Sequence, residues 1–186
     1  GYDTVRGILD SLGFNNIELA RSAFEHDLQL KDAKEMLHRL VELAAKEGRG
    51  FGVKLTNTLG NVNPKDVLPG DERYMSGRTL LPISTRVALV LSEEFNGKLP
   101  VSYSGGASAL SAKDILESGI HPITLATDML KPGGYMRMKQ IAEVLYQSKG
   151  WDMDYIDIAK LKKLVDKASD PEGIVSKDFR GDNKAK

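Results

Sequence analysis

The chain has 186 residues, enough for one domain with a sizeable core, and its 26 basic residues balance 26 acidic ones. We therefore expect neither nucleic acid nor a membrane surface as a partner, and no segment is apolar enough to span a bilayer. Cysteine is absent and the N-terminus lacks a signal-peptide pattern, which excludes disulfides, thiolate metal sites and a cysteine catalyst here and favours a cytoplasmic location.

In the first half of the chain, apolar periodicity predicts helices that alternate with short strands. A helix is expected over residues 4–12 and a strand over residues 16–20. The clearest helix covers residues 32–46, and a strand over residues 51–56 follows it. Residues 59–78 are rich in Asn, Pro, Gly and Asp, and their length indicates a functional loop.

The second half begins with a predicted helix over residues 79–95 and a buried strand over residues 99–104. A helix that opens at Ser108 or Ser111 comes next, and a second buried strand over residues 122–127 follows. Strand, glycine turn, helix and strand within so short a span predict a right-handed crossover, so these two strands should be parallel neighbours.

Two further helices are expected over residues 134–146 and 154–168, and no antiparallel hairpin signal is present. Four strands alternating with helices predict an α/β fold with a parallel sheet. Four strands cannot close a barrel of eight, and the chain begins in a helix, so we expect it to be the C-terminal portion of a larger unit. The open strand edges predict self-association of the isolated segment.

The strand over residues 99–104 ends in Ser104, Gly105 and Gly106. Glycines at a strand-to-helix turn let successive N–H groups point into one concavity, which suits a phosphate. The alternative is an ordinary turn, since paired glycines after a strand are common in α/β proteins.

The same register brings other small or polar residues to the strand ends. These are Thr56-Asn57-Thr58, Met75-Ser76-Gly77-Arg78 and Ala126-Thr127-Asp128. They offer hydrogen bonds and backbone amides rather than a nucleophile and a base. The histidines (His26, His38 and His121) are scattered, so we expect no metal site.

The segments KLTNTLGN, YMSGRTLLPISTRVALVLSEEFNGKLPVSYSGG and ILESGIHPITLATDML resemble the second half of the FMN-binding barrels of dihydroorotate dehydrogenase and dihydropyrimidine dehydrogenase. FGVKLTNTL and DMLKPGGYMRM are similar to the large bacterial selenate reductase subunits, which are glutamate-synthase-related oxidoreductases. The resemblance implies the C-terminal half of a (β/α)8 TIM barrel over residues 1–150. A C-terminal helix (151–170) and a disordered tail (171–186) would follow.

The resemblance also implies the phosphate end of an FMN site. Ser104, Gly105 and Gly106 match the turn that holds the flavin phosphate in that family, and Ala126 with Thr127 match the last-strand element that completes the cradle. Likewise, the pair Ser76-Gly77 matches a loop near the phosphate and ribityl chain.

Other matched positions concern the flavin ring. Asn57 and Thr58 match a strand end that lines the isoalloxazine or the substrate, and Lys54 matches a strand lysine that contacts the ring. In the competing register, that lysine lies upstream of this chain's Lys54. No residue matches the family's catalytic base; Ser22, at the end of IELARS, is the nearest candidate, so the catalytic residue stays unknown.

Asp128 departs from the pattern, because a carboxylate beside a phosphate would repel it. We expect Asp128 to turn away or to pair with Arg78 or Lys131. Tyr135 and Arg137 follow the Pro-Gly-Gly turn and could reach the phosphate, although surface positions are the simpler expectation.

The resemblance therefore predicts a fragment of a flavin-dependent oxidoreductase within a multidomain electron-transfer protein, with iron–sulfur, FAD and NADPH sites on other domains. Its partners would be the N-terminal half of the barrel, the reductase domains and a small-molecule substrate, and the isolated chain would be inactive. One alternative is a catalytically degenerate barrel that serves as a scaffold. Another is a flavin-free phosphate-sugar enzyme with a Schiff base on Lys54.

Overall fold

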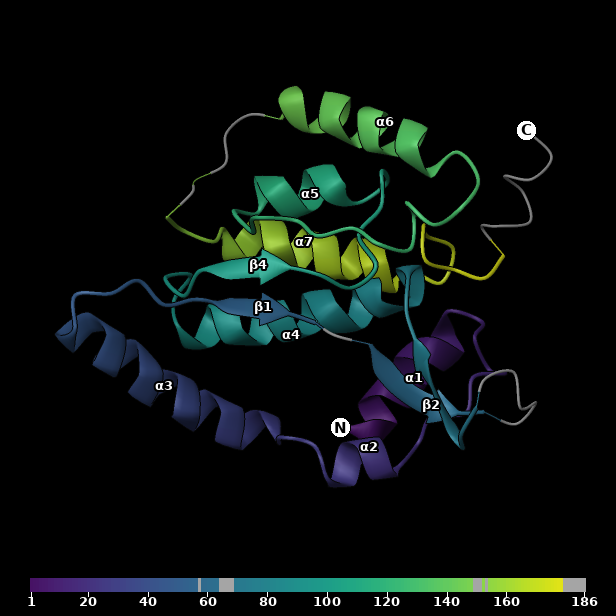
Figure 1. Ribbon diagram of the computed structural model, residues 1–186, viewed down its shortest axis with the longest axis horizontal. Coiled ribbons are helices and arrows are strands. Elements are labelled where there is room, and N and C mark those ends of the chain that lie inside the picture. Colours follow the sequence, from purple (N-terminus) through teal and green to yellow (C-terminus); the bar gives the residue numbers. More distant parts are fainter. Residues whose placement is uncertain (57, 64–68, 149–151, 153, 179–186) are drawn as a thin grey trace.

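In the computed structural model, the described residues are 1–56, 58–63, 69–148, 152 and 154–178. The helices are α1 (Tyr2–Ser11), α2 (Ser22–Glu25), α3 (Leu30–Lys46), α4 (Leu81–Glu94), α5 (Ala112–Glu117), α6 (Gly134–Tyr146) and α7 (Ile158–Ser169), with a 3-10 turn at Arg78–Leu80. The strands are β1 (Val53–Leu55), β2 (Leu59–Val62), β3 (Glu72–Met75) and β4 (Val101–Tyr103). Figure 1 shows how these elements are arranged.

The strands β1 and β4 are parallel neighbours, with Val53 opposite Val101 and Leu55 opposite Tyr103. Tyr103 also forms a parallel bridge with Ile123. This bridge confirms the predicted parallel pairing of residues 99–104 with 122–127, although the second segment forms a single bridge rather than a full strand. The α/β class predicted from the sequence is thus correct.

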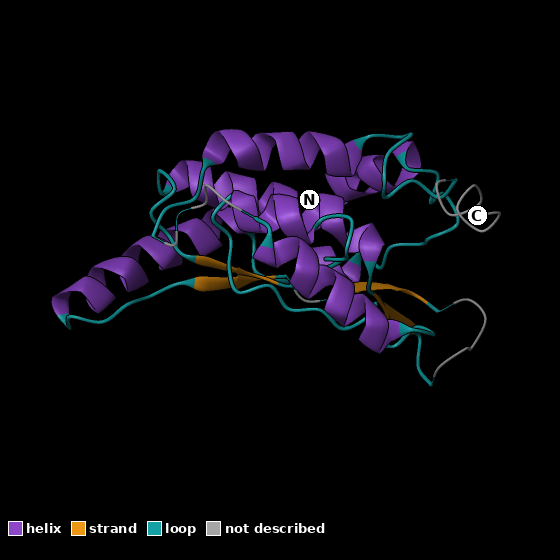
Figure 2. Ribbon diagram, turned by 90° about the horizontal axis from the view of Figure 1, so that it is seen from above, coloured by secondary structure: helices purple, strands orange, loops and turns teal. Residues whose placement is uncertain are grey.

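Helices cover one face of the β1–β4 pair. Side chains alternate between the two faces of a strand, so Val101 and Tyr103 point to the same face, and both are buried. Helix α7 supplies Leu161 and Leu164 to the same hydrophobic core and packs along α4. Figure 2 shows the strands along one side of the molecule and most of the helices on the other. The opposite face of the pair carries Lys54, which is exposed.

Two predictions about strands were wrong. Residues 16–20 form no parallel strand. Instead, Leu19 makes a single isolated bridge to Asn61, and that bridge is antiparallel. The expected loop over residues 59–78 contains an antiparallel hairpin, in which β2 pairs with β3. Asparagine and glycine occupy the two buried central positions of β2, where strand patterns normally show apolar residues, so the sequence signal for this hairpin was weak.

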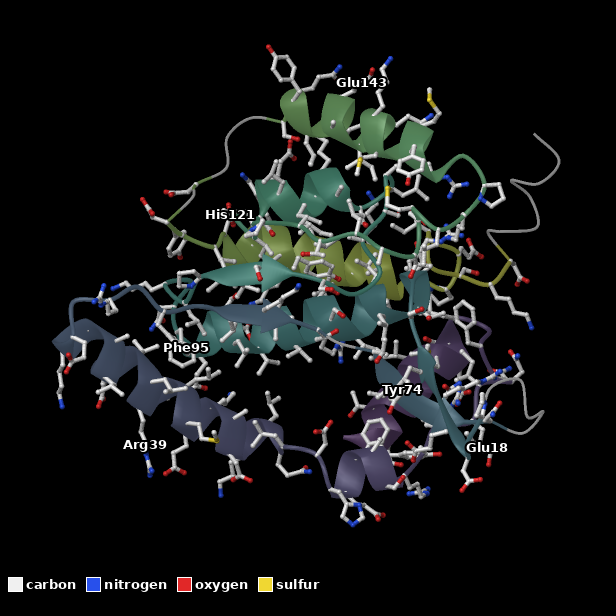
Figure 3. The ribbon with its side chains drawn as sticks, in the orientation of Figure 1. Glu18, Arg39, Tyr74, Phe95, His121 and Glu143 are labelled. Carbon is white, nitrogen blue, oxygen red and sulfur yellow. The ribbon has the colours of Figure 1, made fainter. Side chains whose placement is uncertain are left out.

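Helix α3 begins two residues before the predicted start and ends where predicted, but it has no buried residue. Its link to α4 is polar: Glu94 accepts hydrogen bonds from Lys34 (2.7 Å) and from His38 (2.9 Å). The ring of His38 lies tilted against that of Phe95, with 4.4 Å between the ring centroids. Figure 3 shows Phe95 between α4 and α3, and Arg39 pointing away from the body. We find that α3 is attached by a few contacts rather than by a core.

The C-terminal region is better packed than expected. The side chain of Asp157 accepts a hydrogen bond from the Lys160 amide and so caps α7. Helix α7 is a central helix of the core rather than a separate segment. Within the predicted tail, Val175 is buried and the Lys177 amide donates to the Leu12 carbonyl, so residues 171–178 are ordered. The rest of that tail lies outside the described residues. No helix in the described ranges is long and apolar enough to cross a bilayer.

Candidate functional site

The carboxyl ends of β1 and β4 meet, because the two strands are parallel and in register. The ladder continues one step beyond them: the Thr56 amide donates to the Ser104 carbonyl, and the Ser104 amide donates to the Leu55 carbonyl. The sequence predicted that Thr56 and Ser104 would lie at the carboxyl ends of strands, along the same edge of the sheet. The structure places them side by side.

Three hydroxyl groups from different elements surround Gly105. The Tyr103 hydroxyl donates to the Gly105 carbonyl (2.9 Å), and the hydroxyls of Thr56 and Ser84 lie 2.6 Å apart. A Cβ atom at Gly105 would approach the Ser84 Oγ to 2.5 Å and the Thr56 Oγ1 to 2.9 Å. Residue 105 must therefore be glycine, and this hydroxyl cluster anchors the turn. The roles of Ser84 and of the Tyr103 hydroxyl were missed in the sequence, where both are ordinary core positions.

Gly106 packs against the segment that contains Ser76 and Gly77. A Cβ atom there would lie 2.6 Å from the Gly77 carbonyl oxygen and 2.8 Å from the Leu81 amide nitrogen. Gly77 in turn faces Thr127, whose methyl group would be 3.1 Å from a Cβ atom at residue 77. Three segments that were expected together at the strand ends thus converge around Gly77.

Beside this convergence is a pocket of about 330 Å³. Its lining comes from the segments that follow Gly77, Gly106 and Thr127 in the chain, together with the first turns of α6. The lining residues are Arg78, Ser108, Ala109, Leu110, Asp128, Lys131, Arg137 and Gln140. Three cations against one carboxylate leave the lining with a net charge of +2, which favours an anion.

Asp128 pairs with two of these cations. Its Oδ1 lies 2.9 Å from the Lys131 ammonium and 3.8 Å from the Arg137 guanidinium. The expected pairing of Asp128 with Lys131 is therefore present, and Arg137 faces the pocket. Arg78 donates to the Ile174 carbonyl at 3.2 Å, and Tyr135 is exposed to solvent.

The remaining predicted residues lie elsewhere. Lys54 and Thr58 line a separate groove of about 580 Å³, mostly apolar, between α3, β1 and α4. Ser76 and Ala126 are exposed near the converging segments. Asn57 lies outside the described residues. Two predicted ring-end residues thus line the apolar groove. No predicted phosphate-end residue is among the described residues that line the 330 Å³ pocket, whose lining comes from residues that follow them in the chain.

Ser22, the candidate for a catalytic base, does not stand at a strand end. It is the first residue of α2, and its hydroxyl donates to the Glu72 carboxylate at 2.9 Å. The expectation of a strand-end position was wrong because residues 16–20 do not form that strand. Within the described ranges, no three His, Asp or Glu side chains are grouped to hold a metal ion.

The comparisons with known proteins agree with one another. Residues 1–175 match the family model described as "Oxidoreductase YgfK, N-terminal TIM-barrel domain". The chain is 55% identical over 165 residues to a protein named "Putative oxidoreductase YgfK" in Escherichia coli K12, and equally so to its counterpart in Escherichia coli O157:H7. That alignment covers 89% of this chain but 16% of each relative. No solved structure matches the chain significantly.

Proposed function

Because the chain belongs to the family of the N-terminal TIM-barrel domain of the oxidoreductase YgfK, we propose that it holds the phosphate end of FMN in a flavin-dependent oxidoreductase. The observation that carries this proposal is the convergence of Gly106, Gly77 and Thr127 beside a pocket with three cations. Family membership supports an oxidoreductase barrel, and this convergence supports the cofactor.

The residues of the pocket fit a phosphate monoester. Such a group carries close to two negative charges, which the lining's net charge of +2 balances. Arg78 and Arg137 are suited to bind phosphate oxygens with two parallel hydrogen bonds, and the Ser108 hydroxyl can donate one more. Side chains at residues 77 and 106 would occupy the space where the turns meet. Glycine there keeps the backbone close to the pocket.

When bound, a flavin supplies hydride or electron transfer, while the protein supplies position and electrostatics. The contribution of this chain would be orientation: the cations fix the phosphate, and the hydroxyls around Gly105 fix the turn. Lys54 lies on the uncovered face of the strand pair, beside Ser102 in the register. We propose that the ring of the cofactor lies over that face, with Thr58 at its edge; Asn57, the other residue expected there, lies outside the described residues.

The chain spans 16% of the length of its curated relatives. We propose that it is the second half of a barrel whose remaining strands, together with iron–sulfur, FAD and NADPH sites, belong to the rest of such a polypeptide. Two described parallel strands and one bridge support this, since a closed barrel of this type needs eight. The substrate would be a pyrimidine-like ring or an acceptor such as selenate, reached through the reductase domains.

The experiment measures how tightly the intact protein binds FMN and riboflavin. A flavoprotein is yellow, with absorbance at about 450 nm. FMN should bind much more tightly than riboflavin, which lacks the phosphate. The substitution Arg137→Gln should weaken FMN binding about tenfold or more without changing riboflavin binding. Arg39→Gln, which removes an exposed arginine on α3, is the matched control and should change neither. Equal binding of FMN and riboflavin would contradict the proposal.

Asp128 favours a second candidate function, a scaffold that has lost its cofactor. Its carboxylate already forms ion pairs with two of the three cations that line the pocket. A scaffold would bind neither FMN nor riboflavin, and Arg137→Gln would leave the activity of the intact protein unchanged. The same titration therefore separates the two functions.

A further inference from the structure

The least expected group in the pocket is the carboxylate of Asp128. It follows Thr127 directly, and its side chain is 9% exposed. An acid beside an anion site weakens binding unless its charge is offset. Because the carboxylate of Asp128 is nearly buried, making the surface soluble does not account for an acid at this position.

Its partners are the cations that an incoming phosphate would need. Lys131 lies 2.9 Å and Arg137 lies 3.8 Å from the same oxygen of Asp128, and all three residues line the pocket. Without the carboxylate, the described residues that line the pocket would include three cations, Lys131, Arg137 and Arg78, and no acidic side chain. Asp128 thus stabilises the pocket when no anion is present.

The partners differ in how freely they can move. Lys131 and Arg137 are 37% and 39% exposed, whereas Asp128 is nearly buried. A lysine has a flexible four-carbon stem, and an arginine can present a second edge of its guanidinium, so both can turn toward a new anion. The carboxylate is held in place, and its charge then stands beside the ligand.

We propose that Asp128 is an internal counter-ion that competes with the ligand's phosphate group for Lys131 and Arg137 and thereby lowers the affinity of the site. The identity of the ligand as FMN rests on the proposed function, but the competition applies to any phosphate monoester or inorganic phosphate. Its consequence is a site that exchanges its anion readily rather than one that retains it.

The test is the substitution Asp128→Asn in the intact protein, which removes the charge and keeps the shape. Inorganic phosphate is titrated by calorimetry, and FMN and riboflavin are titrated by quenching of flavin fluorescence. We expect phosphate and FMN to bind about tenfold more tightly, equivalent to about 1.4 kcal/mol, and riboflavin to bind as before. Adding Lys131→Gln to the variant should reverse most of the gain.

The matched control is Asp114→Asn. Asp114, a residue of α5, also pairs with a lysine, Lys167 of α7, but this pair lies at a different surface. Both substitutions change the net charge equally, so a general field effect would tighten phosphate binding in both variants alike. We expect tighter binding only when residue 128 is changed.

The outcomes separate this inference from the proposed function. Unchanged or weaker phosphate binding by a folded Asp128→Asn variant, or equal gains in both variants, would overturn the inference even if FMN binds. Tighter phosphate binding without any uptake of FMN would support it and contradict the flavin proposal. If circular dichroism shows that the Asn variant does not fold, Asp128→Ser removes the same charge and is judged by the same criteria.

Discussion

Gly106 lies directly against Gly77, so close that a Cβ atom on Gly106 would come within 2.6 Å of the Gly77 carbonyl oxygen. These two glycines are far apart in the sequence and belong to different turns. Their contact joins the turn after β4 to the segment before α4. The geometry of the candidate phosphate site therefore depends on the absence of side chains at both positions.

Gly106→Ala should destabilise the protein by about 2–4 kcal/mol, because the methyl group meets backbone atoms and the residue has φ +83°. Gly48→Ala is the control: φ is +60°, but no atom lies within 4 Å of its Cβ position. That variant should lose only about 1 kcal/mol. Chemical denaturation measures both values, and equal losses would contradict the proposed contact.

Gly77→Ala should cause a smaller steric clash than Gly106→Ala, because the atom nearest to the added Cβ is the methyl group of Thr127 at 3.1 Å. Adding Thr127→Ser removes that methyl group and should recover part of the loss. The two substitutions should therefore be non-additive by about 0.5 kcal/mol or more. A double-mutant cycle in denaturation free energy provides the measurement, and strict additivity would show that the two residues do not touch.

Burial raises the pKa of the Tyr103 phenol well above its ordinary value of 10.0. A raised pKa in the folded state means that folding favours the protonated phenol. This contribution to stability is complete below pH 10 and declines as the pH rises further. Tyr103→Phe should lower the free energy of unfolding by about 1–2 kcal/mol at neutral pH, because the Gly105 carbonyl loses its donor. The variant should also lose part of the alkaline pH dependence, which denaturation at several pH values will detect.

The hydrogen bond from His38, followed by that from Lys34, lowers the pKa of the Glu94 carboxyl below its ordinary value of 4.5. A lowered pKa stabilises the folded state above pH 4.5, and this contribution is lost as the pH falls toward the folded-state pKa. Since α3 has no buried residue, Glu94→Gln should release it from α4.

Hydrogen exchange measures this release. Amides of α3 should exchange several-fold faster in Glu94→Gln, while those of α7 should keep their protection. Glu93→Gln is the control, because Glu93 pairs with Lys162 of α7 rather than with α3. Unchanged exchange in α3 would show that its position does not depend on Glu94.

The amino-acid sequence alone determined the α/β class, the helices around the core and the parallel pairing near Tyr103. Hydrophobic periodicity and glycine stops are local signals, and they act in the same way whatever the rest of the chain does. For the same reason, the Ser104-Gly105-Gly106 turn could be recognised from its residues and the apolar strand that precedes them.

Only the tertiary structure decided what these elements meet. The β2–β3 hairpin has asparagine and glycine at the buried positions of β2 and a bridge from Asn61 to the distant Leu19, so its local signal was weak. The unburied α3 and the ordered residues near Val175 depend on contacts between distant segments, which local patterns do not contain. The same holds for the site: Gly77 against Gly106, and Asp128 between Lys131 and Arg137, arise from packing and charge pairing in three dimensions. Sequence patterns identified the turns, and packing determined which of them share a pocket.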